Sequence, residues 1–241
     1  MFGKNQTLKQ HLDPEGSLWV QDIFPTIQGE GPFTGHPAIF IRLAGCNLKC
    51  FYCDTDFESS TWHPSLQQLI DRFAEIAQTI ECCLVVLTGG EPFRQNIVPL
   101  CHSLLGLGYI IQIETAGTLW LNNLSNWSPW PRIVIVCSPK TGKINPEIET
   151  HCINWKYIIR DGEIDPEDGL PTMSTQVLGQ SQRLYRPKQG DIYLQPCEEY
   201  KGIPPQPDPV KTMINMKLCT RIAMKHGYLL SLQTHKFVGL P

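Results

Sequence analysis

The segment Cys46-Asn47-Leu48-Lys49-Cys50-Phe51-Tyr52-Cys53 brings three thiols together within eight residues. Three thiolates at this spacing can hold a four-iron, four-sulfur cluster and leave its fourth iron without a protein ligand. A small molecule that offers an amino nitrogen and a carboxylate oxygen can chelate that open iron. The alternative is a zinc site completed by His63. Because paired C-x2-C knuckles are the usual zinc spacing, the segment predicts an iron–sulfur centre, which measured iron and sulfide would test.

Short apolar runs rich in β-branched residues recur along the chain. They are typical of buried strands and lie at residues 38–43, 84–88, 109–114, 132–137, 155–160, 191–195 and 228–233. Residues 65–80 show helical spacing behind Ser65 as a candidate N-cap. A second helix is predicted over 210–226, closed by Gly227. Strands that alternate with helices predict an α/β fold with a parallel sheet.

Polar motifs follow several of these strands at their carboxyl ends. They are Thr88-Gly89-Gly90-Glu91-Pro92, Glu114-Thr115-Ala116-Gly117, Ser138-Pro139-Lys140, Gln195-Pro196 and Gln233-Thr234-His235-Lys236. In α/β barrels the carboxyl ends of the strands build the active site. The motifs and the cysteine segment are therefore predicted to share one mouth. The adjacent glycines 89 and 90 would let the backbone approach a ligand closely.

Length and composition favour one globular domain that acts on a small molecule. The chain has 241 residues, 41% of them hydrophobic and 18% charged, and a formal net charge of -3. No stretch concentrates Lys and Arg, which argues against a nucleic-acid partner. The start does not resemble a signal peptide and no uncharged run has bilayer length, so we expect a cytoplasmic protein without membrane contact. The proline-rich stretch 201–211 is predicted to be a surface loop.

Seven cysteines lie outside the segment 46–53. Without a secretion signal, disulfides are not expected. Cys197, beside Gln195-Pro196, is a further candidate for the mouth of the barrel. The others have no ligand spacing and are predicted to be small buried hydrophobic residues: Cys82, Cys83, Cys101, Cys137, Cys152 and Cys219.

The C-x3-C-x2-C segment, with Tyr52 before its third cysteine, resembles the radical S-adenosylmethionine (SAM) superfamily. Within it, the chain resembles the 7-carboxy-7-deazaguanine synthase family of queuosine and deazapurine biosynthesis. The matching segments are Phe24-Pro25-Thr26-Ile27-Gln28-Gly29-Glu30-Gly31, residues 40–46, Cys53-Asp54-Thr55, Ser138-Pro139-Lys140 and Gln233-Thr234-His235-Lys236. The resemblance implies the radical SAM fold, a partial, open β/α TIM-like barrel with about six parallel strands. It makes 1–241 a single domain, with an N-terminal extension over 1–23 and a core over 24–241 whose C-terminal tail caps the site.

The resemblance implies three cofactors, a [4Fe-4S] cluster, SAM and Mg²⁺. Cys46, Cys50 and Cys53 would hold the cluster as catalytic residues, and Thr55 would bind magnesium, which keeps several of its waters. On the residues alone, Asp54-Thr55 could equally cap a helix. The SAM-binding residues implied are Tyr52, Cys53, Asp54, Gly90, Glu114, Ser138, Pro139, Lys140, Gln195, Pro196, Cys197 and Glu198.

The implied substrate is 6-carboxy-5,6,7,8-tetrahydropterin, which loses ammonia and contracts to 7-carboxy-7-deazaguanine in a radical reaction that uses SAM catalytically. Arg42 offers a bidentate fork for the carboxylate, with a solvated strand residue as the alternative. Gln28 and Glu30 can bind a pterin edge, with an ordinary polar turn as the alternative. The substrate-binding residues implied are Ile27, Gln28, Gly29, Glu30, Arg42, Thr88, Gln233, His235 and Pro241.

Pro241 follows the apolar tail 237–240. We expect the tail to fold back over the mouth, so that an ionised α-carboxylate of Pro241 accepts hydrogen bonds from the pterin. The alternative is a frayed terminus.

The resemblance also implies a reducing electron donor of the flavodoxin or ferredoxin type, and a homodimer. Two other functions remain open at this point. An activase that generates a glycyl radical on a partner protein would share the cysteine segment but would need an open docking face. A non-catalytic zinc or iron–sulfur binding protein would not cleave SAM.

Overall fold

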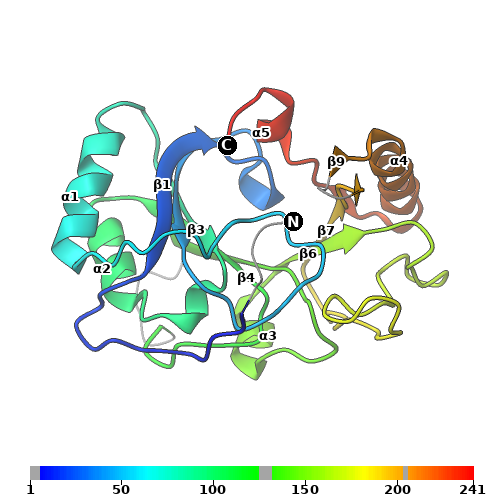
Figure 1. Ribbon diagram of the computed structural model, residues 1–241, viewed down its shortest axis with the longest axis horizontal. Coiled ribbons are helices and arrows are strands. Elements are labelled where there is room, and N and C mark those ends of the chain that lie inside the picture. Colours follow the sequence, from blue (N-terminus) through cyan, green and yellow to red (C-terminus); the bar gives the residue numbers. More distant parts are fainter. Residues whose placement is uncertain (1–5, 125–131, 203–205) are drawn as a thin grey trace.

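The apolar runs form the strands of one large curved sheet (Figure 1). The computed structural model describes residues 6–124, 132–202 and 206–241. The sheet has eight strands in the order β1-β2-β3-β4-β5-β6-β7-β10. Their bounds are β1 (Val20–Ile27), β2 (Pro37–Leu43), β3 (Leu84–Gly89), β4 (Ile110–Thr115), β5 (Ile133–Cys137), β6 (Asn154–Ile159), β7 (Asp191–Pro196) and β10 (Leu229–Leu230). Because β1 and β10 stand at opposite ends of this order, the barrel is open, which confirms the predicted fold class.

In this sheet β2 to β7 and β10 are parallel, whereas β1 runs antiparallel to β2. The sequence pattern does not reveal β1, because its apolar residues at 20, 23, 24 and 27 do not alternate with polar ones and it contains Pro25. A proline is tolerated there since β1 is an edge strand. The prediction of a buried strand over 228–233 is wrong. Only Leu229–Leu230 pair with the sheet, and both side chains are exposed at its edge.

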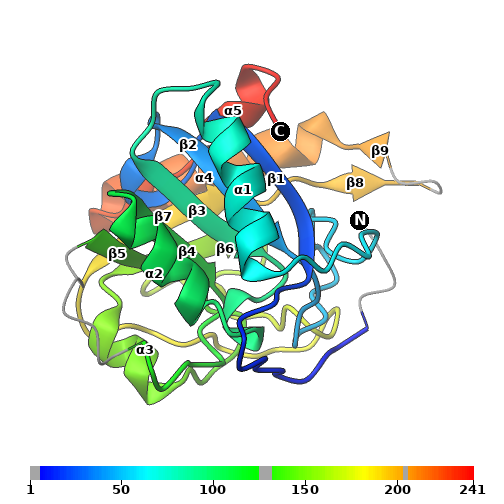
Figure 2. The ribbon, with the colours of Figure 1, turned by 90° about the vertical axis from the view of Figure 1, so that its left-hand side faces the viewer.

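Helices cover the outer side of the sheet (Figure 2). Ser65 caps α1 through a reciprocal bond with Gln68, and Gly227 ends α4 at a φ of 73°, a left-handed conformation that suits glycine. Both helix signals read from the sequence are thus confirmed. The helices are α1 (Leu66–Ala77), α2 (Val98–Gly106), α3 (Pro146–His151), α4 (Pro209–His226) and α5 (Thr234–Phe237), with short 3-10 turns η1 (Gly31–Phe33) and η2 (Pro92–Arg94).

The stretch 201–211 is not simply a loop. It contributes to a two-stranded sheet, β8 (Tyr200–Lys201) with β9 (Gln206–Pro207), and to the start of α4. Residues 203–205 of the predicted loop lie outside the described residues.

Strand β2 divides its side chains between the core and the inside of the barrel, because successive residues point to opposite faces. Ile39, Ile41 and Leu43 pack in the main core under α1 and α2. Phe40 and Arg42 line the inner cavity. One face of the strand therefore stabilises the fold while the other builds the site.

The described residues before β1, from Gln6 on, pack against the cysteine segment and the residues around η2. Leu8 N donates to Cys46 O, and His11 N donates to Arg94 O, both at 2.8 Å. Leu18 is completely buried. This part of the chain therefore supports the loop that carries the three cysteines.

Four of the six cysteines predicted to be small core residues are buried: Cys101, Cys137, Cys152 and Cys219. The prediction is wrong for Cys83, which is exposed, and only partly right for Cys82, because both lie in the connection between α1 and β3, where Cys82 packs only partly against the core. All ten cysteines are free thiols. In the part of the chain that the structure describes, no helix is long and apolar enough to cross a membrane.

Candidate active site

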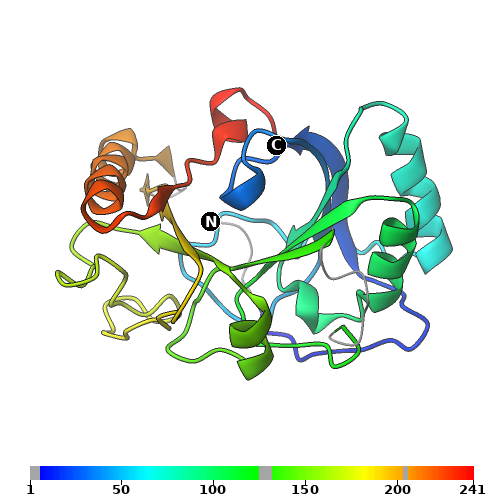
Figure 3. The same ribbon diagram turned by 180° about the vertical axis from the view of Figure 1, so that it is seen from behind.

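A cavity of about 340 Å³ lies inside the curve of the sheet, at the carboxyl ends of the strands. Figure 3 shows α5 beside the segment that follows β1, where the two edges of the sheet face each other. Most of the predicted site residues line the cavity: Gln28, Glu30, Arg42, Cys46, Cys50, Tyr52, Cys53, Asp54, Thr55, Thr88, Gly90, Glu114, Ser138, Lys140, Gln195, Pro196, Cys197, Glu198, Gln233, His235 and Pro241. Three predicted residues lie outside this lining: Ile27, Gly29 and Pro139.

The three cysteines of the segment 46–53 are partly exposed free thiols in the cavity wall. Burial, reinforced for Cys46 by the carboxylate of Glu91, raises the pKa of Cys46 to about 12 and that of Cys53 to about 11. Thiolates at these positions need a cationic partner, which iron ions supply. The donor set therefore fits an iron–sulfur cluster.

His63 does not complete a zinc site with these cysteines. Its ring stacks on Trp19, with the ring centroids 4.2 Å apart, and it is not part of the cavity wall. Among residues 6–124, 132–202 and 206–241, no three His, Cys, Asp or Glu side chains are placed to hold one metal ion. Since a cubane takes one cysteine per iron rather than three thiols on one ion, the cysteines still suit a cluster.

Gly90 brings two stretches of backbone into close contact. A Cβ on Gly90 would lie 1.9 Å from Gly45 O and 3.0 Å from Cys46 N. In the same contact Glu91 N donates to Gly45 O at 3.1 Å. The glycine thus lets the end of β3 support the cysteine segment, a role within the chain that the sequence argument, which assigned it to a ligand, missed.

Glu114, on β4, accepts hydrogen bonds from polar side chains of β3, of β4 itself and of the segment after β1. Its Oε1 accepts from Gln28 Nε2 at 3.1 Å and from Gln112 Nε2 at 2.9 Å, and its Oε2 accepts from Thr88 Oγ1 at 3.0 Å. A carboxylate has about four acceptor positions. Glu114 is therefore held in place and still has capacity for a hydroxyl donor of a ligand.

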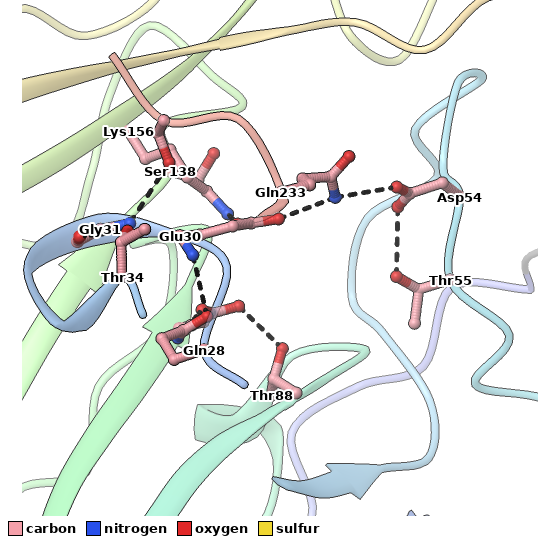
Figure 4. Close-up of polar contacts among 12 residues, drawn as sticks. Gln28, Glu30, Gly31, Thr34, Asp54, Thr55, Thr88, Ser138, Lys156 and Gln233 are labelled. Atoms are coloured by element: carbon pink, nitrogen blue, oxygen red, sulfur yellow. Dashed lines mark hydrogen bonds and ion pairs between the residues drawn. The ribbon is translucent and has the colours of Figure 1, made fainter. Parts of the chain in front are cut away.

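Glu30 and Lys156 form a buried ion pair at the cavity wall (Figure 4), with only 10% of each side chain exposed. Gln233 Nε2 donates to Glu30 Oε1 at 2.7 Å. Burial alone would raise the pKa of Glu30, but the ammonium of Lys156 outweighs it and holds that pKa below its usual range. Burial alone would likewise lower the pKa of Lys156, and the carboxylates of Glu30 and Glu114 raise it instead. Both partners therefore carry their charge near neutral pH.

Asp54 joins the cysteine segment to the C-terminal segment. Its Oδ2 accepts from Lys236 Nζ at 3.1 Å and from Gln233 Nε2 at 3.4 Å. Lys236 Nζ also donates to Glu198 Oε2 at 2.9 Å. Burial alone would raise the pKa of Asp54, and Lys236 outweighs it, so that pKa lies below its usual range. The carboxylate is therefore ionised, and its hydrogen bonds with Gln233 and Lys236 hold it in the cavity wall.

Thr55 lies beside this carboxylate, and its Oγ1 donates to Asp54 Oδ1 at 3.3 Å. The next helix, α1, begins at Leu66. The alternative that Asp54-Thr55 caps a helix is therefore wrong. The pair is instead a set of oxygen atoms that faces the cavity.

Lys140 and Tyr52 share the wall next to the cysteines. Lys140 Nζ donates to Ser138 Oγ at 2.7 Å and lies 5.9 Å from the centroid of the Tyr52 ring. Burial lowers the pKa of Lys140. The ammonium, the hydroxyl and the ring thus form one polar and aromatic surface within reach of a bound molecule.

Arg42 and Gln195 each carry a buried polar atom without a hydrogen-bond partner among the described residues, Nε of Arg42 and Oε1 of Gln195. The guanidinium of Arg42 lies over the ring of Phe24, 5.0 Å from its centroid, so a solvated strand residue does not describe it. Unpaired donors and acceptors at a cavity wall indicate a ligand that supplies the partners.

The last residues of the chain lie against β1. Thr26 Oγ1 donates to the main-chain oxygen of Pro241 at 2.9 Å, and Leu240 N donates to His235 O at 3.0 Å. Leu240 and Pro241 both line the cavity.

Two cationic residues of the cavity were missed by the sequence argument. Lys156 is a single lysine within the apolar run 155–160, a signal that could have been read as a buried functional charge. Lys236 belongs to a quoted motif but was given no role. Its partners Asp54 and Glu198 are distant in sequence, so only the fold reveals the contact. Apolar residues of the wall carried no distinguishing signal: Phe40, Phe57 and Ile158.

Known proteins resemble this chain over its full length, although no family model matches it. It is 44% identical over 242 residues to a 7-carboxy-7-deazaguanine synthase of Rhodospirillum rubrum, and the match covers 100% of both chains. It is 37% identical over 256 residues to a protein of the same name from Rickettsia prowazekii, covering 100% of this chain and 96% of that one.

Among solved structures, the crystal structure of QueE from Escherichia coli is similar in fold. The TM-score is 0.62 at 24% sequence identity, and the match covers 91% of this chain and 95% of the other. The open parallel barrel is therefore shared with that protein.

Proposed function

The chain belongs to the 7-carboxy-7-deazaguanine synthase family, and we propose from this premise that its cavity turns 6-carboxy-5,6,7,8-tetrahydropterin into 7-carboxy-7-deazaguanine and ammonia by radical ring contraction. The observation that carries the proposal is the cavity itself, whose wall contains the three cysteines together with paired and unpaired polar groups. Such a site combines a cluster position with recognition of a flat polar heterocycle.

Cys46, Cys50 and Cys53 would hold the cluster, with SAM beside it. When bound, the cluster and SAM supply the carbon radical that removes a hydrogen atom from the pterin. The chain's own part is to position the reactants and exclude water. Glu114, fixed by Gln28 and Thr88, is suited to accept from a ribose hydroxyl.

The remaining SAM contacts would come from Tyr52, Asp54, Gly90 and from two strand ends. Lys140 and Ser138 offer a donor pair next to Tyr52. The stretch from Gln195 to Glu198 lines the cavity on β7 and just beyond it. These groups surround a volume that a charged, partly aromatic cofactor can occupy.

The substrate would bind between Arg42 and the C-terminal segment. The unpaired Nε of Arg42 suits the substrate carboxylate, because guanidinium and carboxylate match in a bidentate pair. Glu30, Gln28, Gln233 and His235 offer acceptors and donors for the pterin edge. Lys156 keeps Glu30 ionised, so that Glu30 can accept hydrogen bonds from the ring.

Magnesium would bind at Thr55, together with the substrate carboxylate and water. Support comes from the hydroxyl of Thr55 beside Asp54 at the cavity wall. Magnesium often takes few protein ligands and retains waters. The ion would offset the negative charge of the substrate carboxylate next to Asp54.

We also propose a cytoplasmic homodimer that receives its electron from a flavodoxin- or ferredoxin-type donor. The free state of all ten cysteines supports a reducing compartment. The dimer and the donor rest on family resemblance.

The direct test is to reconstitute the cluster anaerobically and supply the carboxypterin, SAM, Mg²⁺ and a reductant. We expect ammonia and the deazapurine, with SAM not consumed in proportion to product. An intact cluster with no product would reject the proposal. Removal of Mg²⁺ should lower the rate, and Thr55→Ala should weaken the response to added Mg²⁺.

A further inference from the structure

The side chain of Gln176 lies against one of the three cysteines. Its Nε2 is 3.1 Å from the sulfur of Cys50. Gln176 belongs to the connection between β6 and β7, so it reaches the cysteine segment from a distant part of the chain. It lies outside every motif considered in the sequence.

The neighbouring hydrogen bonds fix which end of the Gln176 amide faces the sulfur. Its Oε1 lies 2.6 Å from Lys49 N, and a main-chain N–H can only donate. The Nε2 group donates its second hydrogen to Thr175 Oγ1 at 2.6 Å. The Thr175 hydroxyl in turn donates to Lys140 O at 3.0 Å. One hydrogen of Nε2 therefore remains for the sulfur.

The other two sulfur atoms have different surroundings. The closest donor to Cys46 Sγ is the main-chain Leu48 N at 3.4 Å, and Cys53 Sγ contacts Thr55 O at 3.7 Å, an acceptor that cannot donate to a thiolate. Within the described residues, Cys50 is the cysteine of the three whose sulfur receives a side-chain N–H. The contact thus singles out one position of the cluster.

We propose that Gln176 is a positioning residue that raises the reduction potential of the cluster through its hydrogen bond to Cys50, an inference that rests on the proposed function. One-electron reduction adds negative charge to the cluster and its thiolates without breaking a bond. A donor N–H aimed at a ligand sulfur stabilises the reduced state more than the oxidised state. Gln176 therefore makes it easier for the cluster to accept an electron from its donor.

The experiment compares three variants as reconstituted holoenzymes without pterin. Gln176→Met removes both the amide oxygen and the amide nitrogen while keeping a side chain of similar volume. Gln176→Glu keeps an acceptor for Lys49 N but places a carboxylate oxygen at the sulfur. Gln180→Met is the matched control, because Gln180 lies on the same connection with an exposed side chain. Iron and sulfide per chain are measured first, and the midpoint potential is then measured by a mediated redox titration followed by electron paramagnetic resonance.

With full iron content, Gln176→Met should lower the ratio of reduced to oxidised cluster at a fixed solution potential about threefold, a fall of ~30 mV in the midpoint potential of a one-electron couple. Gln176→Glu should lower the midpoint potential further, and Gln180→Met should have the midpoint potential of the wild type. An unchanged midpoint in a fully loaded Gln176→Met enzyme would overturn the proposal. Loss of the cluster from both Gln176 variants would also overturn it, because it would assign Gln176 to holding the segment rather than to tuning. A wild-type chain that takes up no cluster would instead reject the proposed function.

Discussion

The position of the cysteine segment depends on the absence of a side chain at Gly90. The backbone at the end of β3 donates to Gly45 O, one residue before the first cysteine. A methyl group at this position would occupy the same space as that oxygen. The spacing of the thiols is a property of the sequence, but their place beside the sheet depends on this contact.

Gly90→Ala should therefore destabilise the fold around the cysteine segment by about 2 kcal/mol, within the usual range for overpacking, and lower the iron bound per chain. Iron content after reconstitution and the urea midpoint of the apoprotein measure the two effects. Gly106→Ala is the control, since a Cβ there meets nothing within 4 Å, and it should bind iron like the wild type. Full iron content and an unchanged midpoint in Gly90→Ala would contradict the argument.

At the scale of elements, α5 is short and is held mainly by polar contacts. Thr234 N donates to Gly29 O at 3.3 Å, while Gln233 and Lys236 bind carboxylates of the cavity wall. His235 lies half-buried at the cavity, and its Nδ1 is buried without a hydrogen-bond partner among the described residues. The position of this element over the site thus depends on the charge state of the residues around it.

Substrate binding should weaken in mild acid because of His235. Burial lowers the pKa of His235 below its usual value, and the carboxylate of Glu30 offsets this only in part. With α5 detached, the imidazole would titrate near its ordinary pKa of about 6.5. The form with α5 docked over the cavity is therefore fully favoured above that pH, and it loses stability as the pH falls below it.

We expect the pterin KM to be flat above about pH 7 and to rise below about pH 6.5, with a smaller rise in His235→Gln. Comparing the two enzymes cancels the titration of the substrate itself. Identical pH profiles would show that His235 does not control docking.

For the whole molecule, an ion pair connects distant strands of the open barrel across its cavity. Glu30 follows β1 at one edge of the sheet, and Lys156 lies on β6 near the other side, 126 residues away in sequence. Gln233 extends this pair to the C-terminal segment. The ion pair therefore connects the beginning, middle and end of the chain.

Lys156→Met should destabilise the apoprotein by about 3 kcal/mol, because it leaves the buried carboxylate of Glu30 without its counter-charge. The double variant Glu30→Gln with Lys156→Met should recover much of that loss, since no unpaired charge remains. Urea unfolding of the three variants, the third being Glu30→Gln alone, measures the coupling. Equal stability of Lys156→Met and the double variant would contradict the prediction.

Features that depend on local pattern could be predicted before the fold was known. The apolar runs predicted the strands from β2 to β7, Ser65 and Gly227 marked one end each of two helices, and the motifs placed most of the cavity wall. This succeeds because side-chain periodicity and capping act over a few residues. It also succeeds because parallel strands bring their carboxyl ends to one side.

Features that depend on contacts between separate segments became visible only in the folded chain. Examples are β1 at the sheet edge, Gly90 against Gly45, Lys156 paired with Glu30, and Gln176 on Cys50. The physical reason is that a hydrogen bond or an ion pair requires two groups within about 3 Å of each other. The last three of these contacts join residues 45 to 126 positions apart, and no spacing within a single segment specifies such a contact.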